Sequence, residues 1–181
     1  RADDAAPLLC DALLLERRVH GDADHDDVAS ELLNLGSVYS AIRRFDLAEP
    51  VLREALEMYR RLTCGLDAAT VHTAILNYAD LLQALWRHRE AVPLLHEYLH
   101  MARRMHEGGR GSFVEARAAR GLADCYIGGR LWRYMDEAEV LYVEAIAMFR
   151  RLHRGLDHAD IADSLNNLSL VYRKRGRLVK A

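Results

Sequence analysis

Residues that interrupt helices are scarce in this sequence, which has three prolines among 181 residues. Because proline removes a backbone donor and breaks a helix interior, this scarcity favours a helical chain. No uninterrupted apolar run reaches the roughly 20 residues that a membrane-spanning helix needs, so no membrane segment is expected. No secretory signal peptide is visible, although the chain begins at Arg1 without methionine, which leaves a removed or omitted leader open.

Cysteine is also sparse, and neither sign of charge is in excess. Cys10, Cys64 and Cys125 are odd in number and widely spaced, with no CxxC pair, which indicates buried free thiols in a reducing compartment and a cytoplasmic location. The 25 basic and 27 acidic residues leave a net charge of −2. This balance gives no reason to expect nucleic acid or a membrane surface as a partner.

The sequence has internal repetition instead. Paired arginines at 17–18, 60–61 and 103–104 recur every 43 residues, and the pair at 150–151 follows 47 residues later. Apolar residues three and four apart predict two helices in each unit. The first helices are expected over 28–42, 71–85, 114–127 and 161–174, and the second over 46–63, 89–106 and 136–153, with one more at 4–20. The third unit is longer because its turn is expanded around 128–135.

Polar residues and glycines predict where these helices begin and end. Asp27, Thr70 and Asp160 stand where N-caps are expected, and Ser112 with Glu115 reads as a capping box. Glycines follow the second helices as C-terminal stops, namely Gly21, Gly65, Gly108, Gly109 and Gly155. The paired arginines fall in the last turns, where the helix dipole favours cations, and are interpreted as solvated helix ends.

The first helix of each unit contains large and small residues in a fixed order that is typical of a known repeat. The pattern is a large residue, a small neighbour and usually an aromatic three positions on: Leu35-Gly36 with Tyr39, Tyr78-Ala79 with Leu82, Leu122-Ala123 with Tyr126, and Leu168-Ser169 with Tyr172. It resembles the tetratricopeptide repeat. The 43-residue spacing and the segment Gly155–Ala162 followed by Ser164–Leu168 are similar to the kinesin light chain type.

The resemblance implies an all-α, right-handed superhelical solenoid of antiparallel helix pairs. The expected divisions are an orphan second helix at 1–20, repeats at 21–65, 66–109 and 110–155, and a truncated fourth repeat at 156–181. No polar capping helix is evident at either end, so we expect a parent protein that continues in one or both directions.

The resemblance also implies that the first helices present a concave, ligand-facing surface. The positions carried over to that surface are Leu33, Asn34, Ser37, Asn77, Asp80, Gln83, Arg117, Arg120, Asp124, Asn166, Asn167 and Arg173. Three asparagines, Asn34, Asn77 and Asn167, share one place in their repeats. An amide can pair with the backbone of an extended peptide, or it can bond to a neighbouring helix, and both interpretations stay open.

The leading hypothesis is therefore a scaffold that binds a protein or an extended peptide, with no cofactor, no metal, no nucleic acid and no membrane. The alternative is a structural spacer or self-association module, joined through uncapped ends, that regulates an attached enzyme. Trp132 and Tyr134 in the expanded turn either contact a partner or fold onto their own helix pair.

One catalytic pattern occurs, and it is a remote alternative. His96-Glu97-Tyr98-Leu99-His100 fits the H-E-x-x-H motif of zinc peptidases. The repeat itself accounts for Glu97, because Glu54 and Glu144 hold the same place in other repeats. His106 lies too far along the same helix to complete a metal site. We therefore predict that the chain is not an enzyme.

Overall fold

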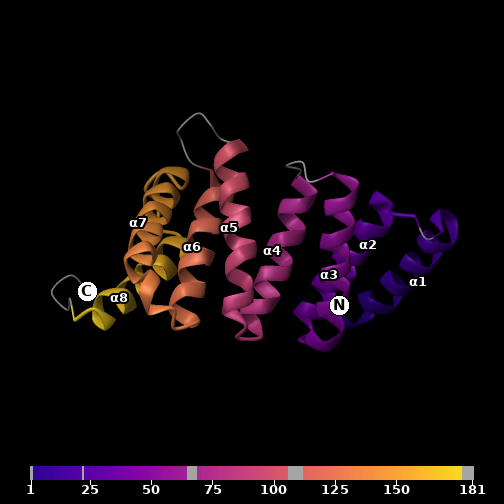
Figure 1. Ribbon diagram of the computed structural model, residues 1–181, viewed down its shortest axis with the longest axis horizontal. Coiled ribbons are helices and arrows are strands. Elements are labelled where there is room, and N and C mark those ends of the chain that lie inside the picture. The colour runs from indigo at the N-terminus through magenta and orange to yellow at the C-terminus, as the bar shows by residue number, and fades with distance from the viewer. Residues whose placement is uncertain (1, 22, 65–68, 106–111, 177–181) are drawn as a thin grey trace. The chain divides into compact units, whose positions relative to one another are not determined.

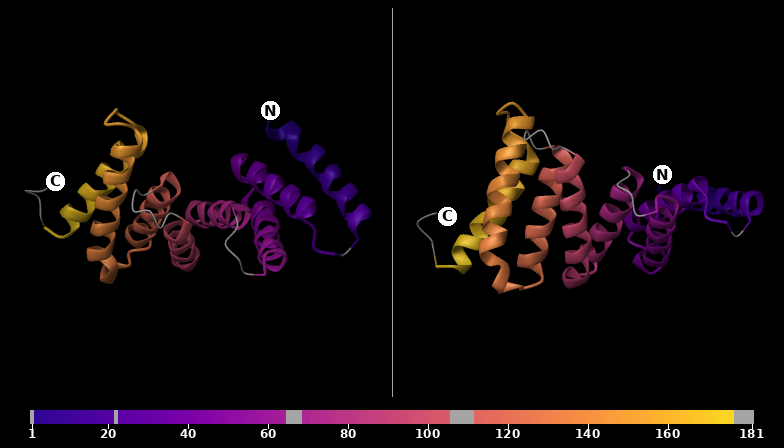
Figure 2. Two further views of the ribbon diagram at one scale, coloured as in Figure 1. Left: turned by 90° about the horizontal axis from the view of Figure 1, so that it is seen from above. Right: turned by 45° about the horizontal axis from the view of Figure 1, so that its top comes forward.

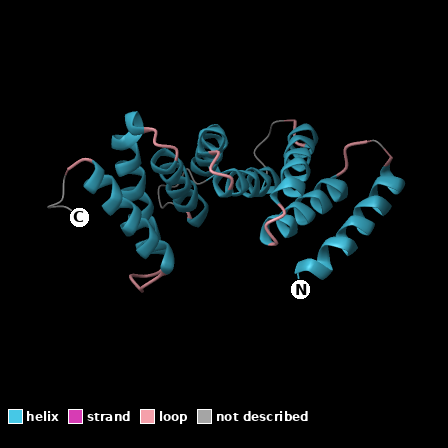
Figure 3. Ribbon diagram, turned by 90° about the horizontal axis from the view of Figure 1, so that it is seen from below, coloured by secondary structure: helices cyan, strands magenta, loops and turns pink. Residues whose placement is uncertain are grey.

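The computed structural model describes residues 2–21, 23–64, 69–105 and 112–176, and these residues form helices and short turns with no strand among them (Figure 3). The helices are α1 (Ala2–His20), α2 (Asp26–Ala41), α3 (Phe45–Leu62), α4 (Ala69–Ala84), α5 (His88–Met105), α6 (Phe113–Gly128), α7 (Met135–Leu152) and α8 (Ala159–Lys174), with a short 3-10 helix η1 at Trp132–Tyr134. The all-α prediction is confirmed, and Figure 1 labels these helices along the chain.

The chain forms two compact units, residues 1–85 with α1–α4 and residues 86–181 with α5–α8. Within each unit, helices that follow one another in sequence pack against one another. Helices α6 and α7, for example, run side by side in the second unit (Figure 2). The predicted repeat boundaries at 65–66 and 109–110 fall outside the described residues, so that division stays a prediction.

Small residues let the two helices of a repeat approach closely. In α3, Ala48, Leu52 and Ala55 are completely buried, on one stripe at helical spacing. Gly36 of α2 faces this stripe, and a Cβ built on Gly36 would lie 2.5 Å from Leu52 Cγ. The small residue of the Leu35-Gly36 pair therefore lies where α2 and α3 approach closely.

Each tight turn between the two helices of a repeat contains a residue with a left-handed backbone. Arg43, Trp86 and Arg130 have φ angles of 61°, 60° and 52°, and Gly176 takes the same place after α8 with φ 69°. Non-glycine residues are strained in this region. The turn geometry therefore recurs even where the sequence supplies no glycine.

Several local predictions need correction. The caps of α2 and α8 are His25 and His158, whose side chains accept hydrogen bonds from the backbone N–H of Asp27 and Asp160. Thr70 lies inside α4 rather than capping it. The expectation of buried thiols holds for Cys125 alone, because Cys10 is half-buried and Cys64 is exposed.

Other predicted helix ends are confirmed. Ser112 Oγ accepts from the backbone N–H of Glu115 at 3.1 Å. Gly21 and Gly155 adopt positive φ angles directly after their helices or the following turn. Gly65, Gly108 and Gly109 lie outside the described residues. No described helix is both long enough and apolar enough to cross a bilayer.

The paired arginines are exposed apart from the half-buried Arg60, and some of them form ion pairs. Arg17 binds Glu54 of α3 at 2.6 Å, and Arg103 makes the equivalent bridge to Glu144 of α7 at 2.9 Å. Each bridge joins the end of one second helix to the middle of the next. Exposed pairs of this kind contribute roughly 0–1 kcal/mol each to stability.

Candidate peptide-binding surface

The first unit has an open groove between its two first helices, α2 and α4. Its volume is about 460 Å³, and its lining residues are Ser37, Ser40, Ala41, Arg43, Phe45, Asn77, Asp80, Leu81 and Ala84. Three predicted site residues, Ser37, Asn77 and Asp80, therefore lie together. Of the other predicted residues in this unit, Leu33 is buried, Asn34 is exposed and Gln83 is half-buried, and none of them lines the groove.

A chain of hydrogen bonds fixes the polar wall of this groove. Asn77 Nδ2 donates to Ser37 Oγ at 2.9 Å, and Ser37 Oγ donates to the Leu33 carbonyl at 2.8 Å. Because Ser37 is anchored on its own helix, the Asn77 amide is held in one orientation. Among the described residues its Oδ1 acceptor has no hydrogen-bond partner, so that oxygen is available to a ligand.

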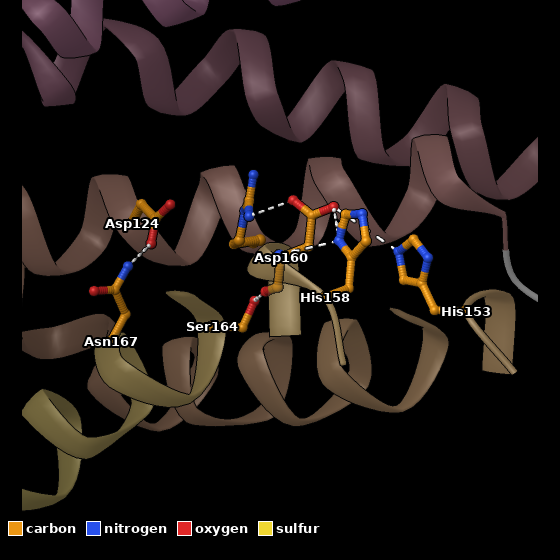
Figure 4. A network of polar contacts seen from close by, with 7 residues as sticks. Asp124, His153, His158, Asp160, Ser164 and Asn167 are labelled. Carbon is orange, nitrogen blue, oxygen red and sulfur yellow. Dashed lines mark hydrogen bonds and ion pairs between the residues drawn. The ribbon is translucent and has the colours of Figure 1, made fainter. Parts of the chain in front are cut away.

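The second unit has the same contact between its own first helices. Asn167 Nδ2 of α8 donates to Asp124 Oδ1 of α6 at 2.8 Å (Figure 4). Tyr142 of α7 donates to the same oxygen at 2.6 Å. Asp124 and Ser37 share one place in the repeat, as do Asn167 and Asn77. At both places the asparagine therefore bonds to a neighbouring helix, which is one of the two predicted interpretations.

Burial and hydrogen bonding act against each other on the Asp124 carboxyl. Burial raises its pKa above the ordinary value, while the hydrogen bonds from Tyr142 and Asn167 and the nearby Arg120 lower it, and burial dominates. The Tyr142 hydroxyl has a strongly raised pKa, first because it is buried and then because the Asp124 carboxylate lies beside it. The Tyr142 hydroxyl is thus buried, while Asp124 and Asn167, which bond to each other across the helices, are half-buried.

Arg120 is likewise engaged inside the second unit. Its guanidinium donates to Asp160 Oδ1 at 2.8 Å and lies over the Phe149 ring at 5.6 Å. Its side chain is 20% exposed. The other predicted residues of this unit differ in exposure: Arg117 is half-buried, and Asn166 and Arg173 are exposed.

The H-E-x-x-H motif lies on α5, and its two histidines are exposed. His96 Nε2 lies 2.7 Å from the Tyr126 hydroxyl of α6, a contact within hydrogen-bond distance. Among the described residues, triads of metal-ligating side chains occur elsewhere and not at this motif. His106 lies outside the described residues. The contact with Tyr126 gives His96 a packing role between α5 and α6.

The two aromatic residues of the expanded turn take different roles. Tyr134 stacks on Tyr126, with ring centroids 4.6 Å apart and ring planes 14° apart. Trp132 is 45% exposed. It lines a hollow of about 600 Å³ with Arg89, Val92, Arg130, Leu131, Arg133 and Tyr134. One ring thus folds onto its own helix pair and the other stays on the surface.

Known proteins can now be compared with this architecture. A tetratricopeptide repeat family model matches residues 28–63. The crystal structure of BtubC (BKLC) from P. vanneervenii aligns with a TM-score of 0.81 at 24% identity, covering 99% of this chain and 68% of that one. The fold is that of a tetratricopeptide-like helical repeat array.

Two further solved structures have a similar fold. A kinesin light chain-type protein of Podosopora anserina with nearly identical TPR-like repeats aligns at a TM-score of 0.77 and 17% identity, covering 99% of this chain and 81% of that one. A Rap protein complexed with competence and sporulation factor aligns at 0.64 and 22% identity, over 84% of this array and 39% of that chain. No curated protein matches the array by sequence.

Sequence reasoning missed the apolar part of the groove. Phe45, Leu81 and Ala84 line it, but they lie at the end of a first helix or just after the turn into a second one. The carried-over positions cover only the faces of first helices. The tight turn at Arg43 brings Phe45 to the groove, and no periodicity within one helix could indicate this.

Proposed function

We propose that this array is a non-enzymatic scaffold that binds an extended peptide segment of a partner protein in the groove of its first unit. The observation that carries the proposal is the groove between α2 and α4, which combines an oriented amide, Asn77, with apolar lining at Phe45 and Leu81. Peptide recognition needs this combination, because polar groups fix the backbone while apolar hollows accept side chains.

The groove favours a particular peptide chemistry. Asn77 Oδ1 can accept a peptide N–H, and Phe45 with Leu81 and Ala84 suits one small apolar side chain. Arg43 and Asp80 are both exposed on the lining. A segment with a small apolar anchor flanked by groups of both charges therefore fits better than a uniformly acidic or basic one.

The Rap complex supports the proposal at the level of fold, since a protein with this repeat architecture is complexed there with competence and sporulation factor. The cytoplasmic location inferred from the sparse cysteines agrees with a partner inside the cell and remains a prediction. Nucleic acid is not expected as a partner, because the net charge is −2.

A displayed library of random peptides tests the proposal. We expect the chain to select peptides with an apolar anchor, and we expect Ala84→Arg to abolish their binding. Ala84 is exposed at the end of α4 and lines the groove, so a long side chain there obstructs the groove without disturbing the interior. Asn77→Ala should weaken binding by removing the oriented amide.

The matched control is Ala147→Arg, which makes the same change at an exposed position of α7 in the other unit. Peptides that bind the wild type, Ala84→Arg and Ala147→Arg equally well would refute the use of the groove. Sedimentation equilibrium separates the alternative function: a spacer or self-association module should oligomerise as concentration rises, without selecting peptides.

A further inference from the structure

The two units contain the same triad of metal-ligating side chains, three repeats apart in the sequence. Each triad has a histidine at the end of a second helix or directly after it, a histidine in the following turn, and an aspartate in the first turn of the next first helix. They are His20, His25 and Asp27 in the first unit and His153, His158 and Asp160 in the second. Figure 4 shows the second triad.

The geometry of the two triads agrees closely. The turn histidine Nδ1 lies 3.4 Å from the aspartate Oδ2 in the first triad and 3.1 Å in the second. The helix histidine Nε2 lies 3.9 Å and 4.0 Å from the same oxygen. The triads belong to separate compact units, so the same arrangement occurs once in each unit.

These separations match those of neighbouring ligands around one metal ion. Zinc bonds of about 2.0–2.2 Å to nitrogen and oxygen in a tetrahedron place adjacent ligand atoms about 3.3 Å apart. The observed histidine–aspartate distances of 3.1–4.0 Å bracket this value, and all three ligand atoms of each triad lie within 4.8 Å of one another. Two imidazoles and one carboxylate form a donor set that suits Zn²⁺, Co²⁺, Ni²⁺ or Cu²⁺ and leaves positions open for water.

Three of the histidine donor atoms make weak contacts or none within the described part of the chain. His153 Nε2 is buried and has no hydrogen-bond partner among the described residues, which is unfavourable for a polar group. His25 and His158 Nδ1 each accept one backbone N–H at 3.3 Å, which is longer than a usual hydrogen bond. An ion would replace weak contacts with strong ones.

The imidazole rings must turn to bind the ion. In the structure they are stacked, with centroids 3.4 Å apart for His20 and His25 and 3.7 Å for His153 and His158, and the planes are nearly parallel. A nitrogen lone pair lies in the plane of its ring, so two parallel rings cannot both direct lone pairs at one ion. Coordination should therefore break the stack.

We propose that each triad binds one divalent transition-metal ion of the zinc class, and that the ion joins one repeat to the next. It would connect the end of α1 to the start of α2, and the end of α7 to the start of α8. The H-E-x-x-H motif takes no part in this binding.

The first triad should bind more tightly than the second. Glu16 Oε2 lies 3.2 Å from His20 Nε2, so a second carboxylate is within reach of an ion there. In the second triad, Arg120 holds the other oxygen of Asp160 at 2.8 Å. The cationic guanidinium reduces the negative charge that the carboxylate can offer to the ion.

Calorimetric titration of the metal-free chain with Zn²⁺ tests the proposal, and Co²⁺ absorption gives an independent optical signal. We expect two ions per chain. His20→Thr and His153→Thr should each remove one, weakening the affected site by more than the roughly 10–100-fold typical of outer-shell changes. Threonine is suitable because Thr63 holds this place in another repeat, where its hydroxyl bonds the Tyr59 carbonyl at 2.9 Å.

Controls separate the triads from other histidines. His100→Ala, which alters the H-E-x-x-H motif, should leave both sites intact, and circular dichroism should show unchanged helix content in every variant. The proposal is overturned if the wild type takes up no Zn²⁺, if neither threonine variant alters the stoichiometry, or if His100→Ala removes an ion.

Discussion

Replacing Gly36 by alanine should destabilise the first unit, because the added methyl group has no room. It would lie 2.5 Å from both Cγ and Cδ2 of Leu52, and Leu52 is completely buried. Since the branch point Cγ as well as a terminal methyl is too close, rotation about χ2 cannot relieve the clash, so the buried Leu52 must repack or α2 must move from α3. Overpacking of this kind costs about 1–3 kcal/mol.

The higher helix propensity of alanine offsets part of this destabilisation. Gly121→Ala is the control, because it changes the helix propensity in the same way without the clash. Alanine gains roughly 0.5–1 kcal/mol over glycine inside a helix. Gly121 also lies inside a helix, α6, but there the nearest atom to a new Cβ is Leu95 Cδ2 at 3.4 Å. Gly121→Ala should therefore be neutral or stabilising, and the two variants should differ by about 1–3 kcal/mol in unfolding free energy.

Hydrogen exchange resolved by helix is the suitable assay, because repeat arrays often unfold in parts and need not behave as two-state systems. Protection should fall in α2 and α3 of Gly36→Ala and stay or rise in α6 of Gly121→Ala. Equal protection in the two variants would show that the helix pair is not held by close contact at Gly36.

Three further outcomes follow. Trp86→Gly should stabilise the chain by up to about 1 kcal/mol in thermal denaturation, because it relieves a positive φ at a residue that is 79% exposed; a lower melting temperature would contradict this. Ser112→Ala should cost about 1 kcal/mol in the same assay by removing the cap to Glu115, and Ser112→Asp should not. The pKa of the Asp124 carboxyl is raised in the folded chain. The stability that the protonated carboxyl contributes is therefore complete below the pKa of about 3.9 in the unfolded chain and is lost as the pH rises through the pKa in the folded chain. Asp124→Asn should therefore flatten the stability profile between about pH 4 and neutrality, whereas an unchanged profile would show that this carboxyl is not the cause.

Helix positions could be predicted from the sequence because the apolar periodicity is long and repeated. Helix ends were less predictable. Histidine is not a usual N-cap, so the sequence predicts Asp27 and Asp160 as the caps. In the structure, α2 and α8 each begin one residue before these aspartates, directly after the capping histidines. The ring nitrogen of a histidine accepts a backbone hydrogen bond just as a carboxylate does, and composition does not show which of the two will cap.

The sequence predicts which helices carry the candidate site residues, but it does not predict their hydrogen-bond partners. Asn77 and Asn167 were correctly placed on first helices, yet the sequence left open whether their amides face a ligand or a neighbour. The answer depends on Ser37 and Asp124, which lie on the preceding first helix at hydrogen-bond distance. A contact between residues 40 and 43 positions apart depends on how the helices pack, and single-helix periodicity cannot supply it.

Locating a bound peptide on the chain tests whether the groove between α2 and α4 is the binding site. A library-selected peptide with a photoreactive side chain at its apolar anchor is cross-linked to the chain, and the attachment sites are identified by mass spectrometry. The groove predicts attachment within α2, α4 and the turn that ends at Phe45. Attachment confined to the exposed faces of α5 or α7, or to the turn that carries Trp132, would contradict it.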